Sequence, residues 1–280
     1  LNALQVGVFL ALTGLIGFTT WWFCRDSLGR GKGENAESDY FLAGGSLKWY
    51  FVAGSITLTN LSTDQLVGMN GAQMALLAWW ELAAVVGLIM LALIFIPVYY
   101  KYNCTTTTEL LERRYGNPHF RALISILFLL GNIGIFLPAI LYGGSLFMIN
   151  LFDLDINLYI VAALFAIVGA AYAIFGGLRA VAVSDTFSGV LLLGLAILVT
   201  IIALNAIGWD FSGIPKERLT LIGAPDSDIP FATLFTGMLF IQMFYWSTNQ
   251  TITQRAMASP TVREAQKGIF AAAAIRLLLV

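Results

Sequence analysis

Two stretches of the chain place polar side chains inside otherwise membrane-like sequence, where they could bind a polar solute. In the first, the cluster Asn60-Leu61-Ser62-Thr63-Asp64-Gln65 interrupts a run that resembles a membrane helix. Backbone can unwind at membrane depth only where it is buried in protein or lines a cavity. Discontinuous helices of this kind form the binding sites of many secondary transporters. The cluster therefore predicts a broken helix beside a polar cavity.

The second stretch runs from Gln242 to Gln254 and reads Q-M-F-Y-W-S-T-N-Q-T-I-T-Q. Gln242, Tyr245 and Asn249 have the spacing i, i+3, i+7, so on a regular helix they would share one face. Tyr245 and Trp246 each offer a flat apolar plate with a polar edge, which suits stacking on a sugar ring. An aromatic belt at the membrane surface explains them poorly, because they lie mid-span among amides.

Four ionisable residues fall inside predicted helices: Asp64, Glu81, Asp185 and Arg276. An ionised side chain at the centre of a membrane helix costs about 2.5–3.5 kcal/mol on insertion scales, so such residues usually mark a functional cavity. A static pair that holds helices together is the alternative for any one of them. We expect Glu81 and Arg276 to meet across the cavity, with Asp185 as the next candidate partner for Arg276.

The composition indicates which elements position these groups. The chain has 280 residues, of which 59% are hydrophobic and 11% charged, and soluble domains carry about 25% charged residues. It is therefore predicted to be an all-α integral membrane protein, and its net charge of −1 gives no reason to expect a nucleic-acid partner. Seven hydrophobic segments and a partial eighth can be drawn: 2–23, 48–72, 76–100, 121–149, 157–176, 181–207, 231–254, and a stub from about 268.

The distribution of Lys and Arg predicts the orientation. If the first segment runs from outside to inside, the outer loops hold only Lys216 and Arg218. The inner loops then hold these residues: Arg25, Arg30, Lys32, Lys48, Lys101, Arg113, Arg114, Arg121, Arg179, Arg255, Arg263 and Lys267. We therefore expect a multi-pass cell-membrane protein with its N-terminus outside.

The interrupted segments are the second and the seventh, five apart and running in opposite directions. This spacing is what two inverted repeats of five helices would give. The last apolar run, from about residue 268 to Val280, is about half as long as the roughly 20 residues that cross a membrane. The sequence is therefore expected to be a fragment.

Several motifs, in order along the chain, identify a family. They are S-D-Y-F-L-A-G-G-S-L (38–47), N-L-S-T-D-Q-L-V-G-M-N-G (60–71), W-E-L (80–82), E-L-L-E-R-R-Y-G (109–116), I-F-G-G-L-R-A-V-A-V-S-D (174–185), F-Y-W-S-T-N-Q-T-I-T-Q-R (244–255) and E-A-Q-K-G (264–268). They resemble the solute:sodium symporter family, and most of all its sodium/sugar cotransporter branch. The resemblance implies a five-plus-five inverted-repeat, LeuT-like core. Residues 1–25 would be an extra helix, 47–207 the first repeat, and 231–280 the start of an incomplete second repeat.

The resemblance also implies roles for single residues. The positions that match sugar-contacting or sugar-covering residues are Asn60, Gln65, Glu81, Gln242, Tyr245 and Arg276. Trp246, which follows Tyr245, is also a candidate solute-binding residue. Two of the matching positions depart from the family pattern, since Arg276 replaces a lysine and Gln242 an asparagine, and Ala84 stands where a serine can touch the sugar. Leu58 and Leu61 match positions whose backbone carbonyls ligate sodium, and Asp185 matches an acidic residue near the sodium exit route.

The resulting prediction is a symporter that uses sodium to import a sugar or sugar-like solute by alternating access, without an organic cofactor. Two alternatives stay open: a carboxylate or vitamin as the solute, which Arg276 could clamp, or a transporter-like sensor module of a longer signalling protein. An enzyme is not expected, because the sequence has no HExxH or GxSxG motif and no nucleophile with a base. The sequence does not indicate an oligomeric state.

Overall fold

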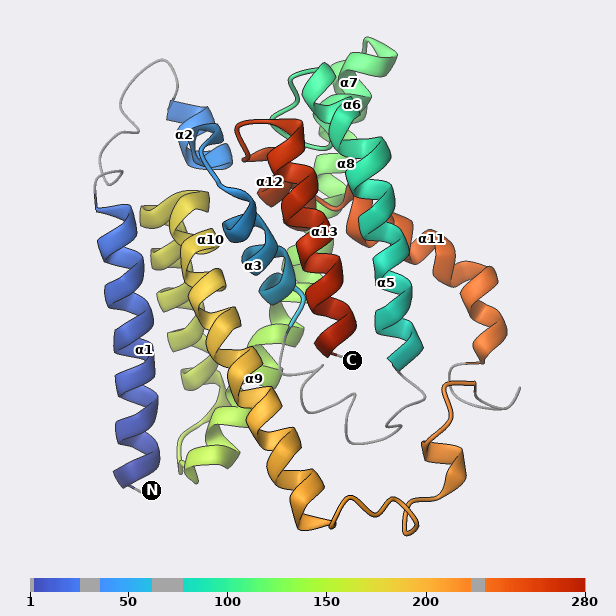
Figure 1. Ribbon diagram of the computed structural model, residues 1–280. Helices are drawn as coiled ribbons and strands as arrows, with labels where there is room; N and C mark the ends of the chain where they lie inside the picture. Colours follow the sequence, from blue (N-terminus) through green and yellow to red (C-terminus); the bar gives the residue numbers. More distant parts are fainter. Residues whose placement is uncertain (1–2, 26–35, 62–77, 223–229, 280) are drawn as a thin grey trace.

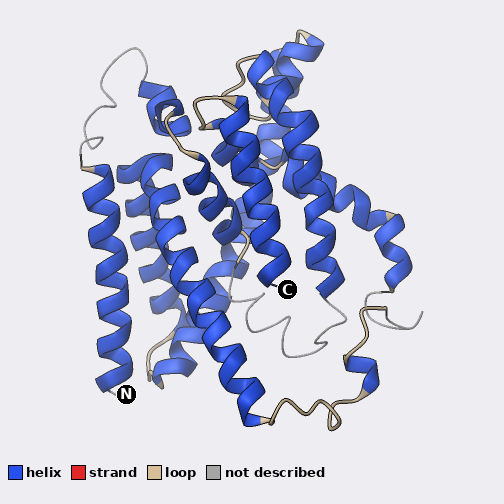
Figure 2. Cartoon of the chain, in the orientation of Figure 1, coloured by secondary structure: helices blue, strands red, loops and turns tan. Residues whose placement is uncertain are grey.

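The computed structural model describes residues 3–25, 36–61, 78–222 and 230–279. Every regular element within these ranges is helical, and they contain no β-strand (Figure 2). The all-α architecture predicted from the composition is therefore confirmed.

The N-terminal part contains the first predicted segment and the start of the second. Helix α1 spans Ala3–Cys24, close to the predicted 2–23. The short helix α2 (Ala36–Leu42) and a 3₁₀ turn (Ala43–Gly45) were not predicted, because seven residues are too few for a periodic signal. Helix α3 spans Trp49–Thr59, and the rest of the predicted 48–72 segment lies mostly outside the described residues.

The third and fourth predicted segments are each one helical run with a π-helical turn inside it. The third consists of α5 (Ala78–Met90), a π turn (Leu91–Phe95) and α6 (Ile96–Lys101). The fourth consists of α8 (Pro118–Gly131), a π turn (Asn132–Phe136) and α9 (Leu137–Phe152). Between them lies a second unpredicted short helix, α7 (Glu109–Tyr115).

The fifth and sixth segments are the two arms of α10 (Leu158–Ala206), which bends sharply at Gly177 (φ 59°, ψ −170°). A side chain disfavours this conformation, so glycine is what allows the chain to turn back. The predicted break between 157–176 and 181–207 is thus confirmed. A 3₁₀ turn (Lys216–Arg218) lies in the long loop that follows.

The seventh segment is irregular throughout. It contains a 3₁₀ turn (Phe231–Phe235), α11 (Gly237–Met243), a π turn (Phe244–Thr248) and α12 (Gln250–Met257). Helix α13 then spans Val262–Leu279 and begins earlier than the predicted stub. The sequence-based boundary was wrong here because Glu264 and Lys267 form an ion pair across the first turns (3.0 Å), and these polar turns carry no hydropathy signal.

Helix α3 lies at the centre of the bundle, between α10 and α13 (Figure 1). Two glycines allow this close approach. A Cβ at Gly54 would lie 2.6–2.8 Å from Thr186 of α10, and one at Gly268 of α13 would lie 2.7 Å from Val52. The interrupted helix is therefore held from both sides by close helix–helix contacts.

Four helical runs of the described residues are long and apolar enough to cross a membrane: Ala3–Cys24, Glu81–Lys101, Pro118–Phe152 and Leu158–Ala206. The connections that carry most of the described basic residues lie at one end of the bundle, at the top of Figure 1. They include the α6–α8 connection, which carries Arg113 and Arg114, and the first turns of α13, which carry Arg263 and Lys267. This is the arrangement that the distribution of Lys and Arg predicted.

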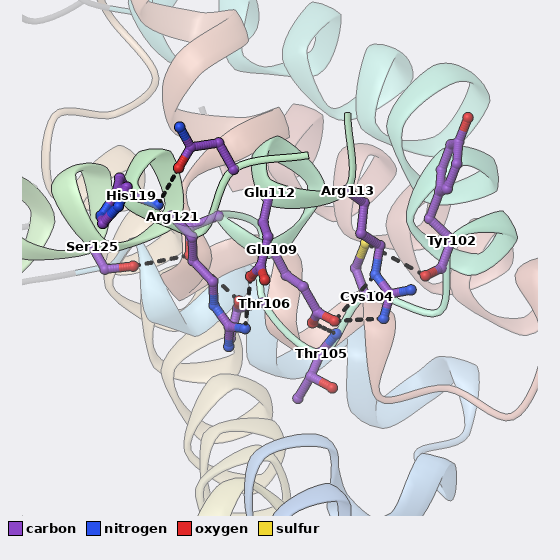
Figure 3. A network of polar contacts seen from close by, with 12 residues as sticks. Tyr102, Cys104, Thr105, Thr106, Glu109, Glu112, Arg113, His119, Arg121 and Ser125 are labelled. Atoms are coloured by element: carbon purple, nitrogen blue, oxygen red, sulfur yellow. Dashed lines mark hydrogen bonds and ion pairs between the residues drawn. The ribbon is translucent and has the colours of Figure 1, made fainter. Parts of the chain in front are cut away.

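Polar contacts order the α6–α8 connection at this end (Figure 3). Glu109 accepts a hydrogen bond from the Thr105 N–H (2.7 Å) and pairs with Arg113 (2.6 Å), and Glu112 pairs with Arg121 (3.2 Å). Burial disfavours the charged carboxylate, but the bonds from Arg113 and Thr105 hold the pKa of Glu109 below its ordinary value. The connection is also joined to α12, because the Thr107 N–H donates to Gln250 (2.7 Å).

Candidate functional site

The first predicted break begins where α3 ends. Thr59 is the last helical residue, Asn60 follows as the C-cap, and the Leu61 N–H donates to the Leu58 carbonyl (2.9 Å). Gln65 and Asp64 lie outside the described residues, so their predicted roles stay predictions. The helix therefore stops where the polar cluster begins, as the sequence indicated.

The second break lies between α11 and α12. Asn249 is extended (φ −69°, ψ 124°), and its side chain accepts a hydrogen bond from the Thr251 N–H (3.0 Å). The Tyr99 hydroxyl donates to the Ser247 carbonyl (3.3 Å) just before the break. The inference that Asn249 shares a regular helix face with Gln242 and Tyr245 was wrong, because the π turn and the extended residue change the register. Asn249 instead caps α12.

A cavity of about 220 Å³ lies between these elements. Its walls come from the end of α3, from α5, from α11 with its π turn, and from α13. The lining residues are Asn60, Glu81, Ala84, Ile241, Gln242, Tyr245, Trp246 and Arg276. The structure thus gathers around one cavity every predicted solute residue that lies within the described ranges.

Glu81 and Arg276 form an ion pair in the wall of this cavity, which confirms their predicted contact. Glu81 belongs to α5 and Arg276 to α13, so the pair joins segments 195 residues apart. The Arg276 guanidinium also lies over the Trp246 ring, with 4.6 Å between its central carbon and the ring centroid. A carboxylate, a guanidinium and an indole from three elements therefore form one group, which we call the Glu81 triad (Glu81, Trp246, Arg276).

A second ion pair, between buried Arg255 and partly buried Asp185, joins α10 to α12. The Asp185 carboxylate lies 3.5 Å from the Arg255 guanidinium, and the Ser55 hydroxyl donates to Asp185 (2.6 Å) and accepts from Arg255 Nε (2.7 Å). Arg255 also donates to the Thr251 carbonyl. The sequence-based assignment of Arg255 to an inner loop was wrong, because its side chain is buried in α12. Its partner Asp185 is 70 residues away along the chain, and no local pattern indicates such a contact.

Comparisons with known proteins agree with this architecture. The profile of the Sodium:solute symporter family matches residues 40–280. This chain belongs to the sodium:solute symporter family. The fold also matches the solved structure of a Na⁺-coupled sialic acid symporter in a substrate-bound outward-open state, with a TM-score of 0.73 at 19% identity. The match covers 97% of this chain and 57% of that one, and it confirms the predicted LeuT-like fold class.

Named relatives include two bacterial symporters and a mammalian one. The chain is 36% identical to the uncharacterized symporter YidK of Escherichia coli (strain K12) over 99% of its length, which is 51% of that protein. It is 30% identical to the sodium/glucose cotransporter of Vibrio parahaemolyticus (all of this chain, 53% of that protein). A sodium/myo-inositol cotransporter 2 from Mus musculus is 29% identical over 85% of this chain. The chain thus spans about half the length of the bacterial relatives, and the family consists of transporters rather than enzymes, as expected.

Proposed function

We propose that the protein containing this chain is a sodium-coupled symporter that imports a neutral polyhydroxylated solute of the sugar class by alternating access. The cavity carries the proposal, because it combines amide, carboxylate and aromatic side chains in a small volume. Asn60, Glu81 and Gln242 would bond solute hydroxyls, and Tyr245 would cover the ring of the solute. The relatives named as glucose and myo-inositol cotransporters support a solute of this class.

The charge of the cavity favours a neutral solute over a carboxylate. Arg276 is the residue that would clamp an anion, yet it forms an ion pair with Glu81 in the wall of the cavity. An anionic solute would have to compete with this carboxylate for the guanidinium. Hydroxyl groups can both donate and accept, so a polyol can bond to this wall without separating the pair.

We assign sodium coupling to the break after α3. The Leu58 carbonyl, which accepts one hydrogen bond from the Leu61 N–H, and the Leu61 carbonyl both lie at the end of this helix. Carbonyls at such breaks are typical sodium ligands in broken-helix transporters. Asp185 would lie along the sodium route, and ligands beyond residue 280 would complete the site. The basic loops at one end of the bundle support an N-terminus outside the cell membrane.

The test is uptake by the full-length protein in proteoliposomes with an imposed sodium gradient. The panel should contain labelled neutral sugars, cyclic polyols and the matching sugar acids. We expect at least one neutral solute to accumulate with sodium and not with potassium outside, and the matching sugar acid to compete at least tenfold less well. Equal uptake in both salts would disprove the coupling, and stronger competition by the sugar acid would disprove the neutral solute.

Tyr245 offers a second test of the same site. It lines the cavity from the π turn, so Tyr245→Ala should reduce coupled uptake at least tenfold while the protein is still produced and folded. The matched control Tyr245→Phe keeps the plate and removes the hydroxyl, and it should retain most of the uptake. Normal uptake by the alanine variant would show that Tyr245 does not cover the solute.

A further inference from the structure

The members of the Glu81 triad differ in how much of each is accessible. The Arg276 side chain is 3% exposed and the Glu81 side chain 18% exposed. The Arg276 guanidinium contacts both the Trp246 ring and the Glu81 carboxylate. The carboxylate is thus the member of the triad that a solute reaches most readily.

Trp246 is itself fixed to the helix that carries Glu81. It is 2% exposed, and its ring contacts Tyr245 edge to face with 5.2 Å between the centroids. The adjacent Ser247 hydroxyl donates to the Gly87 carbonyl of α5 (2.8 Å). A Cβ at Gly87 would lie 2.8 Å from Trp246 Cβ, so the π turn and α5 are in direct contact. These contacts therefore fix the position of the indole relative to Glu81.

We propose that Trp246 and Arg276 are positioning residues: they hold the Glu81 carboxylate, whose solute contact belongs to the proposed function, in the orientation that accepts a hydrogen bond from one hydroxyl. This inference rests on the proposed function and specifies which residues orient that carboxylate. A guanidinium can stack on an indole while one edge binds a carboxylate, whereas a lysine ammonium is a compact point charge. The arginine at position 276 thus has a role that the lysine expected from the resemblance would not fill in the same way.

The proposal restricts the chemistry of the solute. An ionised carboxylate accepts hydrogen bonds and cannot donate one, so Glu81 selects a hydroxyl that donates its proton. A deoxy analogue at that position loses the bond, and a deoxyfluoro analogue loses it too, because fluorine has no proton to give. If Arg276 contacted the solute instead, fluorine could still accept from it.

The first arm of the test uses no solute. Fluorinated tryptophans with increasing numbers of fluorine atoms are placed at position 246 of the full-length protein, which weakens the ring's attraction for a cation with little change in shape. The thermal unfolding midpoint in detergent should fall stepwise in the protein with Arg276 and stay level in an Arg276→Gln background. If the thermal midpoint does not change with fluorination in either background, the proposed role of Trp246 is wrong.

The second arm measures sodium-dependent solute affinity with deoxy and deoxyfluoro analogues at each hydroxyl. We expect one position where both analogues bind at least tenfold more weakly than the parent. Glu81→Gln, Arg276→Gln and the most fluorinated Trp246 should each reduce this discrimination at the same position. A deoxyfluoro analogue that binds like the parent, or an Arg276→Gln effect at another hydroxyl, would overturn the proposal.

The two arms separate this inference from the proposed function. If no solute on the panel accumulates with sodium, the proposed function fails together with the solute contact of Glu81. The thermal arm would then still decide whether Trp246 holds Arg276. A stepwise thermal series with unchanged analogue discrimination would show that the triad is a structural contact only, which contradicts the inference.

Discussion

Glu81–Arg276 and Asp185–Arg255 are both carboxylate–guanidinium pairs that connect the first part of the chain to its last helices. They differ in what surrounds them. Asp185 and Arg255 share the Ser55 hydroxyl, and Arg255 also bonds a backbone carbonyl. Glu81 and Arg276 line a cavity, with an aromatic ring as their further neighbour. The Asp185 side chain is 19% exposed and that of Glu81 18%, so the two pairs differ in their neighbours and not in their exposure. A hydroxyl bridges the first pair, whereas the second lines the cavity in which we propose that the solute binds.

The largest expected effect comes from breaking the pair that Ser55 bridges. Arg255→Gln leaves Asp185 as an unpaired and largely buried charge, which should reduce the free energy of unfolding by about 3 kcal/mol. The double variant Asp185→Asn/Arg255→Gln removes both charges and should be more stable than either single variant. The thermal midpoint of the full-length protein in detergent measures this. Additive losses would show that the two charges do not interact.

The cavity pair should respond more in solute affinity than in stability. Glu81→Gln and Arg276→Gln should each weaken solute binding at least tenfold, and the double variant should lose less than the sum of the two. The coupling free energy between the two changes should exceed about 1 kcal/mol, which lies within the roughly 0.5–3 kcal/mol found for residues in direct contact. A double-variant cycle on affinity measures it, and a loss of stability as large as that of Arg255→Gln would erase the contrast between the pairs.

Gly87 allows the cavity pair to be disturbed without changing a charge. A Cβ there would lie 2.5 Å from the Gln242 carbonyl oxygen, so Gly87→Ala must push the π turn away from α5. Overpacking of this kind costs about 1–3 kcal/mol, and solute affinity should fall as the triad separates. The matched control is Gly131→Ala, since a Cβ at Gly131 meets nothing within 4 Å. Equal effects of the two variants would contradict the close contact.

The smallest effect is expected at the exposed end of the bundle. Arg113 is 44% exposed, so Glu109→Gln should reduce stability by no more than about 1 kcal/mol. Because folding lowers the pKa of Glu109, its contribution is present at neutral pH and is lost as the pH falls below the ordinary carboxylate range. A thermal midpoint that is equally sensitive to acid in the variant and the parent would show that Glu109 contributes nothing.

The local features of this protein follow from its sequence alone. Long apolar runs predict the helices, the gap between the runs 157–176 and 181–207 predicts the bend in α10, and the polar cluster after Thr59 marks the end of α3. These signals are short-range, because each depends on residues within a few turns of one another. The motifs further indicated the family and the residues that line the cavity.

The tertiary structure decided which groups meet. Three contacts join distant segments of the chain. They are the Asp185–Arg255 pair, the stacking of the Arg276 guanidinium on Trp246, and the hydrogen bond from the Tyr99 hydroxyl to the Ser247 carbonyl. Hydropathy could not place Arg255 in the core, since an arginine has the same hydropathy value in the interior as in a loop. A charge is stable in the interior only when a partner lies close to it, and that partner is supplied by the packing of α3, α10 and α12.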